Sequence, residues 1–198
     1  VDATGIARAL VTNLGDSGRQ GASTITQQYV RNSLAERGYL DGDAEQVSAA
    51  TEQTTERKLR EIKYALALEK TQSKDEILTG YLNIAPFGPI TYGVEAASQR
   101  YFSKSASELN YLEAALLAGL VQSPVQYDPL THPEAAQERR DTVLATMLEQ
   151  GVITQEEYDQ GVATSVESML HPTVSSEGCS GTPSAQAYFC DYVLSQFL

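Results

Sequence analysis

Apolar residues recur at helical spacing along most of this chain. Ile6, Leu10 and Leu14 lie four residues apart, which predicts one apolar stripe on a helix from Asp2 to about Leu14. Two further stripes follow Ser105 and His132-Pro133, and their apolar members are Leu109, Leu112, Leu116 and Leu120 in the first and Val143, Leu144, Met147 and Leu148 in the second. No stretch alternates with a sustained period of two residues, so the pattern predicts an all-α domain.

Several helix starts are marked by capping boxes, in which a Ser or Thr is followed three residues later by Glu. The pairs are Ser73 with Glu76, Ser105 with Glu108, and Thr154 with Glu157. After about Val162 the composition changes, and Ser, Thr, Gly and Pro dominate up to Pro183. We therefore predict a helical domain over residues 1–162, followed by an irregular linker over residues 163–198.

The composition allows one hydrophobic core and limits the kinds of ligand. The chain has 198 residues, of which 41% are hydrophobic, and no apolar run is long enough for a membrane span. The net charge of −12 argues against binding to nucleic acid or to anionic lipid. An anionic substrate would therefore need cations placed locally around it. Residues 40–56 contain five acidic residues and no basic residue, and we interpret this segment as a flexible acidic loop.

The first candidate site is a polar segment at positions 21–32, Gly-Ala-Ser-Thr-Ile-Thr-Gln-Gln-Tyr-Val-Arg-Asn. Core packing gives no reason for so many hydroxyls and amides in a row, because a buried polar group costs free energy unless it finds a partner. On a helix that starts near Thr24, the side chains of Thr24, Gln28 and Arg31 share one face. The simpler interpretation is a Ser-capped helix with a solvated polar face.

The second candidate site follows the acidic segment. Arg57, Lys58 and Glu61 are spaced so that the carboxylate lies one turn after the two cations. The ordinary interpretation is a surface salt-bridge pattern that contributes roughly a few tenths of a kcal/mol. The alternative is a group of cations that binds an anionic substrate, with Glu61 held between them.

Both segments resemble motifs of one known family, the peptidoglycan glycosyltransferase domain of class A penicillin-binding proteins. Positions 21–32 are similar to its Gly-Gly-Ser-Thr-(Ile/Leu)-Thr-Gln-Gln-x-x-Lys-Asn signature, and Arg57-Lys58-x-x-Glu61 matches its third motif. Further similar segments follow in the family's order, at positions 73–83, 92–97, 113–124 and 132–144. Ordered matches over most of the first 160 residues are highly specific for this family.

The resemblance implies a lysozyme-like α fold and a defined reaction. The family polymerises the lipid-linked precursor lipid II into β-1,4 glycan strands and releases undecaprenyl pyrophosphate. By motif, Glu61 is the catalytic carboxylate near the donor, and the substrate-binding residues are Thr24, Gln28, Arg31, Arg57 and Lys58. Arginine suits phosphate oxygens because its planar fork binds two of them at once. The resemblance requires no cofactor and predicts no metal ligands, but it leaves room for a divalent cation, Mg²⁺ or Mn²⁺, at the pyrophosphate.

The chain departs from the family's motifs at three places. Only the last two residues of the first motif are present, as Val1-Asp2, so we expect the general base upstream and expect this piece alone to be inactive. Arg31 stands where the family usually has Lys, which keeps the charge but changes the geometry of the contact. Ala22 replaces the usual second Gly. Two alternatives stay open: a non-catalytic glycan- or lipid-binding remnant, and a lysozyme-like enzyme that cleaves glycan.

The resemblance also implies a location and partners. It places the protein at the extracytoplasmic face of the bacterial cytoplasmic membrane, attached through an upstream anchor. Lipid II and the growing glycan strand would be its substrates, and other cell-wall synthesis proteins would be its partners. A transpeptidase domain is expected after the linker.

Cys179 and Cys190 are the two cysteines of the chain, and both lie in the predicted linker. They could be free buried thiols, or zinc ligands together with the distant His171, although a zinc site normally uses more ligands than these provide. A disulfide that closes a Gly/Pro-rich loop outside the cytoplasm is the favoured interpretation.

Overall fold

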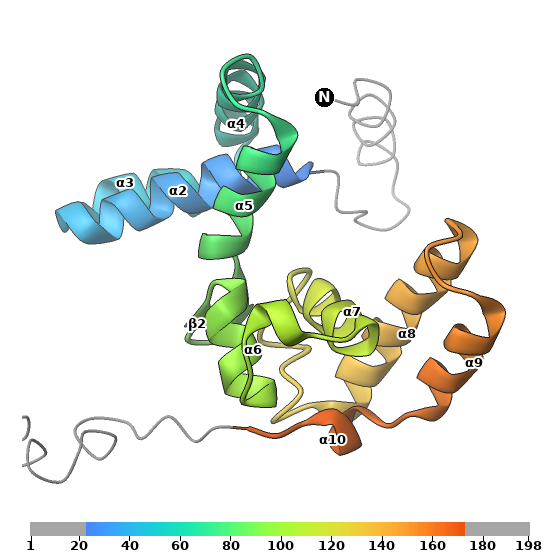
Figure 1. The fold of residues 1–198 in the computed structure, drawn as a ribbon. Coiled ribbons are helices and arrows are strands. Elements are labelled where there is room, and N and C mark those ends of the chain that lie inside the picture. The colour runs from blue at the N-terminus through green and yellow to red at the C-terminus, as the bar shows by residue number, and fades with distance from the viewer. Residues whose placement is uncertain (1–22, 173–198) are drawn as a thin grey trace, which may run out of the picture.

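The computed structural model describes residues 23–172, and its elements form two groups (Figure 1). The first group consists of α2 (Ile25–Asp41), α3 (Ala44–Thr51), α4 (Thr55–Leu68) and α5 (Lys74–Ile84). The second group consists of a hairpin of β1 (Pro86–Gly88) and β2 (Thr91–Tyr92), a 3₁₀ turn at Ala106–Glu108, and the helices α6 (Val94–Phe102), α7 (Tyr111–Leu120), α8 (Pro133–Glu149), α9 (Gln155–Ala163) and α10 (Val166–Met169). The all-α prediction is confirmed for this part of the chain, apart from the hairpin, whose strands are too short to show alternation in the sequence.

Helix α2 begins where the sequence predicts it. Thr24 is its N-cap, and the Thr24 hydroxyl oxygen accepts a hydrogen bond from the Gln27 backbone N–H at 3.3 Å. The helix ends at Gly42, whose φ of 68° is left-handed and therefore suits glycine.

The acidic segment at 40–56 is largely helical, so its interpretation as a flexible loop is wrong. Asp43 caps α3, because its carboxylate accepts a hydrogen bond from the Gln46 backbone N–H at 2.9 Å. Helix α3 then packs on α2 at Gly38, where a Cβ would come within 2.8 Å of the Val47 side chain. Acidic residues that look like a solvated loop in the sequence thus serve as a cap and as the exposed face of a short helix.

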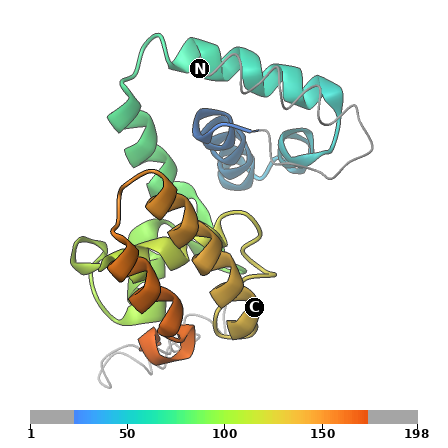
Figure 2. The same ribbon diagram turned by 90° about the vertical axis from the view of Figure 1, so that its right-hand side faces the viewer.

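Helix α5 joins the two groups, as Figure 2 shows for the segment that runs from the first group down to the second. In its middle, Gly80 packs directly against the Tyr29 ring of α2, so that a Cβ at Gly80 would overlap the phenol. At its end, Tyr81 and Ala85 are buried in the core of the second group. The two groups are therefore connected through packed side chains as well as through the chain.

The main core of the described residues lies in the second group, around α7. Leu116 and Leu120 are fully buried there, as predicted. The capping box predicted at Ser105 and Glu108 is present, but it starts only the 3₁₀ turn and not the long helix. The long helix begins at Tyr111 after a second capping box, in which the Asn110 side chain accepts from backbone N–H groups and Glu113 bonds back to the Asn110 N–H.

Helix α8 begins at Pro133, as predicted. Of its predicted inward-facing residues, Leu144 is fully buried, and the partly buried ones packed against the same cluster are Val143, Met147 and Leu148. The capping boxes predicted at Ser73 and Thr154 are also present.

The described residues after Ala163 lie against the helical domain. Val166 and Met169 of α10 are buried, and the His171 backbone N–H donates to the Tyr101 carbonyl at 2.9 Å. The boundary predicted at residue 162 stays a prediction. The helix predicted at residues 2–14 and the Cys179–Cys190 disulfide lie outside the described residues.

Candidate active site

The contact between α2 and α4 is built largely from polar side chains. Thr26 and Gln27 of α2 and Glu61 of α4 are buried, and Gln27 and Glu61 are only 1% and 2% exposed. A buried polar side chain is stable only when its hydrogen-bonding groups find partners. The partners in this contact bring the two candidate segments together.

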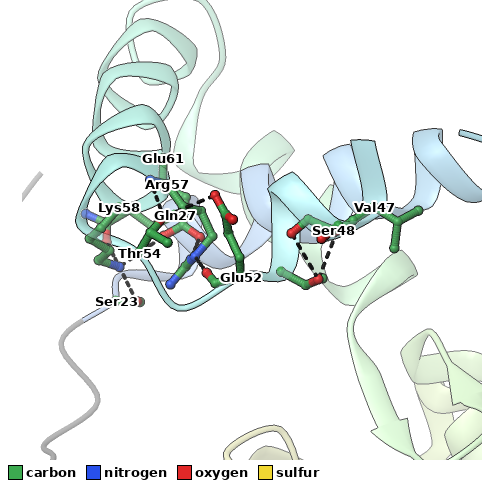
Figure 3. Close-up of polar contacts among 10 residues, drawn as sticks. Ser23, Gln27, Val47, Ser48, Glu52, Thr54, Arg57, Lys58 and Glu61 are labelled. Atoms are coloured by element: carbon green, nitrogen blue, oxygen red, sulfur yellow. Dashed lines mark hydrogen bonds and ion pairs between the residues drawn. The ribbon is translucent and has the colours of Figure 1, made fainter. Parts of the chain in front are cut away.

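Lys58 is the residue that links the two helices (Figure 3). Its ammonium donates to the Gln27 side-chain oxygen at 2.8 Å and to the Ser23 hydroxyl oxygen, both at the start of α2. It also lies 3.1 Å from a carboxylate oxygen of Glu61. The ammonium therefore has three oxygen partners, which use its three N–H groups and fix its position.

Glu61 is held between two cations. One of its carboxylate oxygens pairs with Lys58, and the other pairs with the Arg57 guanidinium. Glu61 is almost fully buried, whereas Arg57 and Lys58 are 15% and 30% exposed. The surface salt-bridge interpretation is therefore wrong, because the carboxylate at its centre is removed from solvent.

The backbone before α4 fixes Arg57 as well. Thr54 caps the helix by accepting from the Arg57 backbone N–H at 3.1 Å, and the Arg57 side chain donates to the Glu52 carbonyl oxygen. Arg57 and Lys58 thus lie in the first turn of α4, where the helix dipole disfavours positive charge. The cluster itself thus contains two cations and one buried carboxylate, and two further carboxylates lie nearby, that of Glu56 in the same turn and that of Glu52, which accepts from the Thr54 hydroxyl.

Gln28 contacts Tyr81 of α5, and the charge of Arg31 acts on the same tyrosine. The Gln28 amide donates to the Ser23 carbonyl at 3.4 Å, and the Gln28 side-chain oxygen accepts from the Tyr81 hydroxyl at 3.3 Å. Burial raises the pKa of Tyr81, and the positive charge of Arg31 lowers it in part. Arg31 therefore lies close enough to Tyr81 to act on its ionisation.

The predicted site residues are thus brought together to different degrees. Arg57, Lys58 and Glu61 form one cluster, and Lys58 connects it to Ser23, next to Thr24. The hydroxyl of Thr24 caps α2 and can still donate its proton, since a hydroxyl accepts and donates at once. Among the described residues, Gln28 is connected to the cluster through Ser23, and the charge of Arg31 acts on Tyr81 of α5.

Sequence reasoning missed Gln27, the most buried polar residue of this contact. The helical face drawn through Thr24, Gln28 and Arg31 leaves Gln27 out. The available signal was the pair of adjacent amides at 27–28, because two neighbouring glutamines on a helix point in directions about 100° apart and need two sets of partners.

Two further findings bear on the chemistry. Within residues 23–172, no group of three or more His, Cys, Asp and Glu side chains is arranged to hold a metal ion. None of the helices in that range is long and apolar enough to cross a membrane.

Comparison with known proteins defines the class. The family model of transglycosylases matches residues 1–148 of this chain. The chain therefore belongs to the transglycosylase family, and the resemblance seen in its motifs is confirmed.

Individual relatives agree with this assignment. The chain is 41% identical to penicillin-binding protein 1A of Streptococcus oralis over 84% of this chain and 24% of that protein. It is 43% identical to penicillin-binding protein 1A of Aquifex aeolicus over 82% of this chain and 20% of that protein. It is also 44% identical to penicillin-binding protein 2a of Streptococcus pneumoniae, again over 82% of this chain and 20% of that protein.

The chain thus spans only about a fifth to a quarter of the length of these relatives. A crystal structure of penicillin-binding protein 1A from Haemophilus influenzae is similar at 42% identity, with a TM-score of 0.46, over 51% of this chain and 15% of that one.

Proposed function

We propose that the protein containing this chain is a peptidoglycan glycosyltransferase that polymerises lipid II into β-1,4 glycan. The observation that carries the proposal is the buried Glu61 carboxylate between Arg57 and Lys58, with Lys58 also bonded to the start of α2. Two motifs about thirty residues apart in a transglycosylase sequence meet at that ammonium.

The proposed reaction moves the growing glycan from undecaprenyl pyrophosphate to the next lipid II. The bond between the anomeric carbon of the donor and the pyrophosphate oxygen breaks, and a bond from that carbon to the acceptor 4-hydroxyl oxygen forms with inversion. The acceptor proton passes to a base that we do not assign within residues 1–198. Negative charge develops on the leaving pyrophosphate, so cations held beside it lower the barrier.

Arg57 and Lys58 suit this task because their positions are fixed before the substrate binds. Arg57 is held by Glu52 and Glu61, and Lys58 is held by its three oxygen partners. Preorganised charges stabilise a transition state without the cost of reorganising at the moment of reaction. Glu61 provides the common partner of both cations, and Arg31, Thr24 and Gln28 supply further donors along α2.

A divalent cation, Mg²⁺ or Mn²⁺, would help Arg57 and Lys58 to neutralise the negative charge of the pyrophosphate. Glu61 is the carboxylate of the cation cluster, and both of its oxygens already contact cations. A bound ion would therefore be held mainly by the phosphate oxygens of the substrate. We expect EDTA to lower the rate less than Lys58→Met does.

The proposed substrate also defines a location. Lipid II is anchored in a membrane by its polyprenyl chain, and its polymerised product belongs to the cell wall. We therefore propose that the protein works at the extracytoplasmic face of the cytoplasmic membrane, held there by a part outside this chain, beside other cell-wall synthesis proteins.

The deciding experiment supplies the natural protein that contains this chain with labelled lipid II and, separately, with labelled polymerised glycan. A glycosyltransferase converts the first into long strands and leaves the second intact. Cleavage of the glycan without polymerisation would support a lysozyme-like enzyme. Binding of lipid II with neither reaction would support a non-catalytic binding module, and either result would overturn the proposal.

A further inference from the structure

Gln27 has the burial and the bonding of a residue that acts through Lys58. Its side chain is 1% exposed, and its amide oxygen accepts from the Lys58 ammonium at 2.8 Å. This distance is shorter than the 3.1 Å that separates the ammonium from the Glu61 carboxylate. A buried amide next to an ammonium stabilises the charge without neutralising it, unlike a carboxylate.

The geometry around Lys58 gives this neutral partner a specific purpose. Lysine is a compact charge on a flexible stem, and its ammonium costs entropy to hold in one place. Glu61 attracts the ammonium from within α4, while Gln27 and Ser23 attract it toward the start of α2. With Glu61 alone, the ammonium would follow the carboxylate rather than remain between the two helices.

We infer that Gln27 is a positioning residue that holds the Lys58 ammonium at the α2–α4 contact, where it stabilises the leaving group of the reaction. This inference rests on the proposed function. Gln27 itself contacts no substrate, because it is buried beneath the cluster. Its loss changes the position of a charge and leaves the number of charges the same.

Thr26 offers a matched control on the same helix. It is also buried at 7% exposure, and its hydroxyl also makes a hydrogen bond from α2 to the residue that ends α4, donating to Glu69 at 2.6 Å. It does not contact Lys58 in any hydrogen bond of the described residues. Thr26→Val therefore removes an interhelical hydrogen bond of the same kind and leaves the cation cluster in place.

The first test measures the contact without using activity. An amine-reactive acylating reagent is applied to the natural protein, and modification of Lys58 is compared with that of the exposed Lys63 on the same helix by mass spectrometry of peptides. An amine reacts only after its proton and hydrogen bonds are released, so Gln27→Met should raise the labelling of Lys58 by about threefold or more relative to Lys63. Thr26→Val should leave the ratio unchanged. Equal ratios in Gln27→Met and wild type would overturn the inference.

The second test is a double-variant cycle on lipid II polymerisation. Gln27→Met should lower kcat by about tenfold with KM within about threefold, because the lost contact matters in the transition state. Thr26→Val should stay within about threefold of wild type in both constants. In the Lys58→Met background, adding Gln27→Met should change kcat/KM by less than about twofold, because a residue that acts through Lys58 has nothing left to position.

The possible outcomes distinguish failure of the positioning role of Gln27 from failure of the proposed function. A further tenfold loss in the Lys58→Met background would show that Gln27 supports the fold rather than Lys58, and would overturn the positioning role. If the wild-type protein makes no polymer, the proposed function fails and the catalytic role of Gln27 fails with it. The labelling ratio then still shows whether Gln27 holds Lys58, so the cause of the failure is known.

Discussion

The hydroxyl of Tyr81 on α5 donates a hydrogen bond to the side-chain oxygen of Gln28 on α2. Tyr81 is also part of the main hydrophobic core. One side chain thus connects the core of the second group with the polar segment that the family's signature marks. The polar segment at the start of α2 is therefore held from two sides, by α4 through Lys58 and by α5 through Tyr81.

The first prediction concerns Arg31, beside this tyrosine. Arg31→Gln should lower kcat/KM for lipid II polymerisation by about tenfold, or about 1.4 kcal/mol, because it removes a cation proposed to contact the substrate phosphates. Arg31→Lys should stay within about threefold of wild type in kcat/KM, since it keeps the charge.

The same Arg31→Gln change should raise the pKa of Tyr81, because the Arg31 charge lowers it in the wild type. Steady-state kinetics and a spectroscopic tyrosine titration provide the two readouts. An unchanged Tyr81 titration would show that Arg31 does not lie where the structure places it.

The second prediction concerns Glu61. Glu61→Gln should lower polymerisation by at least about a hundredfold, or about 2.7 kcal/mol of barrier, because Arg57 and Lys58 lose their common partner. Its burial at 2% exposure also predicts a loss of stability of about 1 to 3 kcal/mol, so activity is to be measured well below the unfolding midpoint.

Glu56 provides the control for Glu61 on the same helix. It pairs with Arg60 at 3.8 Å, and its side chain is 86% exposed. Glu56→Gln removes one carboxylate from α4 and should leave both activity and stability close to wild type. A Glu61→Gln variant within threefold of wild type would refute the assignment of Glu61.

The α2–α4 contact illustrates how far a sequence can predict a site. The motif segments and the helix that starts at Thr24 could be predicted, because caps and spacing are local properties. The partner of each side chain could not, because the direction in which α2 meets α4 depends on tertiary packing. This is why Gln27 was missed while Gln28, one position further on, was selected.

The same limit applies to the fold. The capping boxes at Ser73 and Thr154 predicted helices that the structure contains. The box at Ser105 predicted a long helix but starts only a short turn, because Asn110 provides a competing cap five residues later. Helix α3 was missed because the acidic residues around it suggested a solvated loop. A helix this short is stabilised mainly by its packing on α2, which the local sequence does not reveal.

The third prediction uses Tyr101, which is fully buried and donates to the Phe87 carbonyl at 3.0 Å. Burial in the core, assisted by the charge of Asp128, raises the pKa of Tyr101 from 10.0 to about 12. The folded state therefore holds the phenol proton more tightly than the unfolded state does. The contribution to stability is complete below about pH 10 and is lost as the pH rises toward 12.

The measurement is urea unfolding at several pH values between 9 and 12. The free energy of unfolding should fall with rising pH, and it should fall less steeply in Tyr101→Phe, which has no proton to lose. Other groups that titrate in this range affect both proteins equally. Parallel pH profiles for the two proteins would contradict the assignment.

The fourth prediction concerns Cys179 and Cys190, which we expect to form a disulfide. Closing a loop of about eleven residues should stabilise that segment by roughly 2 to 3 kcal/mol in the loop-entropy model. Mass spectrometry of protein isolated under non-reducing conditions from outside the cytoplasm should show the linked peptides. Two alkylated thiols in that sample would exclude the bond.

The separation in sequence between Lys58 and its partners has a consequence for how the protein acquires its site. The contacts of Lys58 with Gln27 and Ser23 span 31 and 35 residues, and Glu61 follows three residues later. All of these partners lie within or before α4 in the chain, and none of them comes from the second group of helices. During synthesis, the cation cluster can therefore assemble as soon as α4 has emerged from the ribosome, before the second group of helices exists.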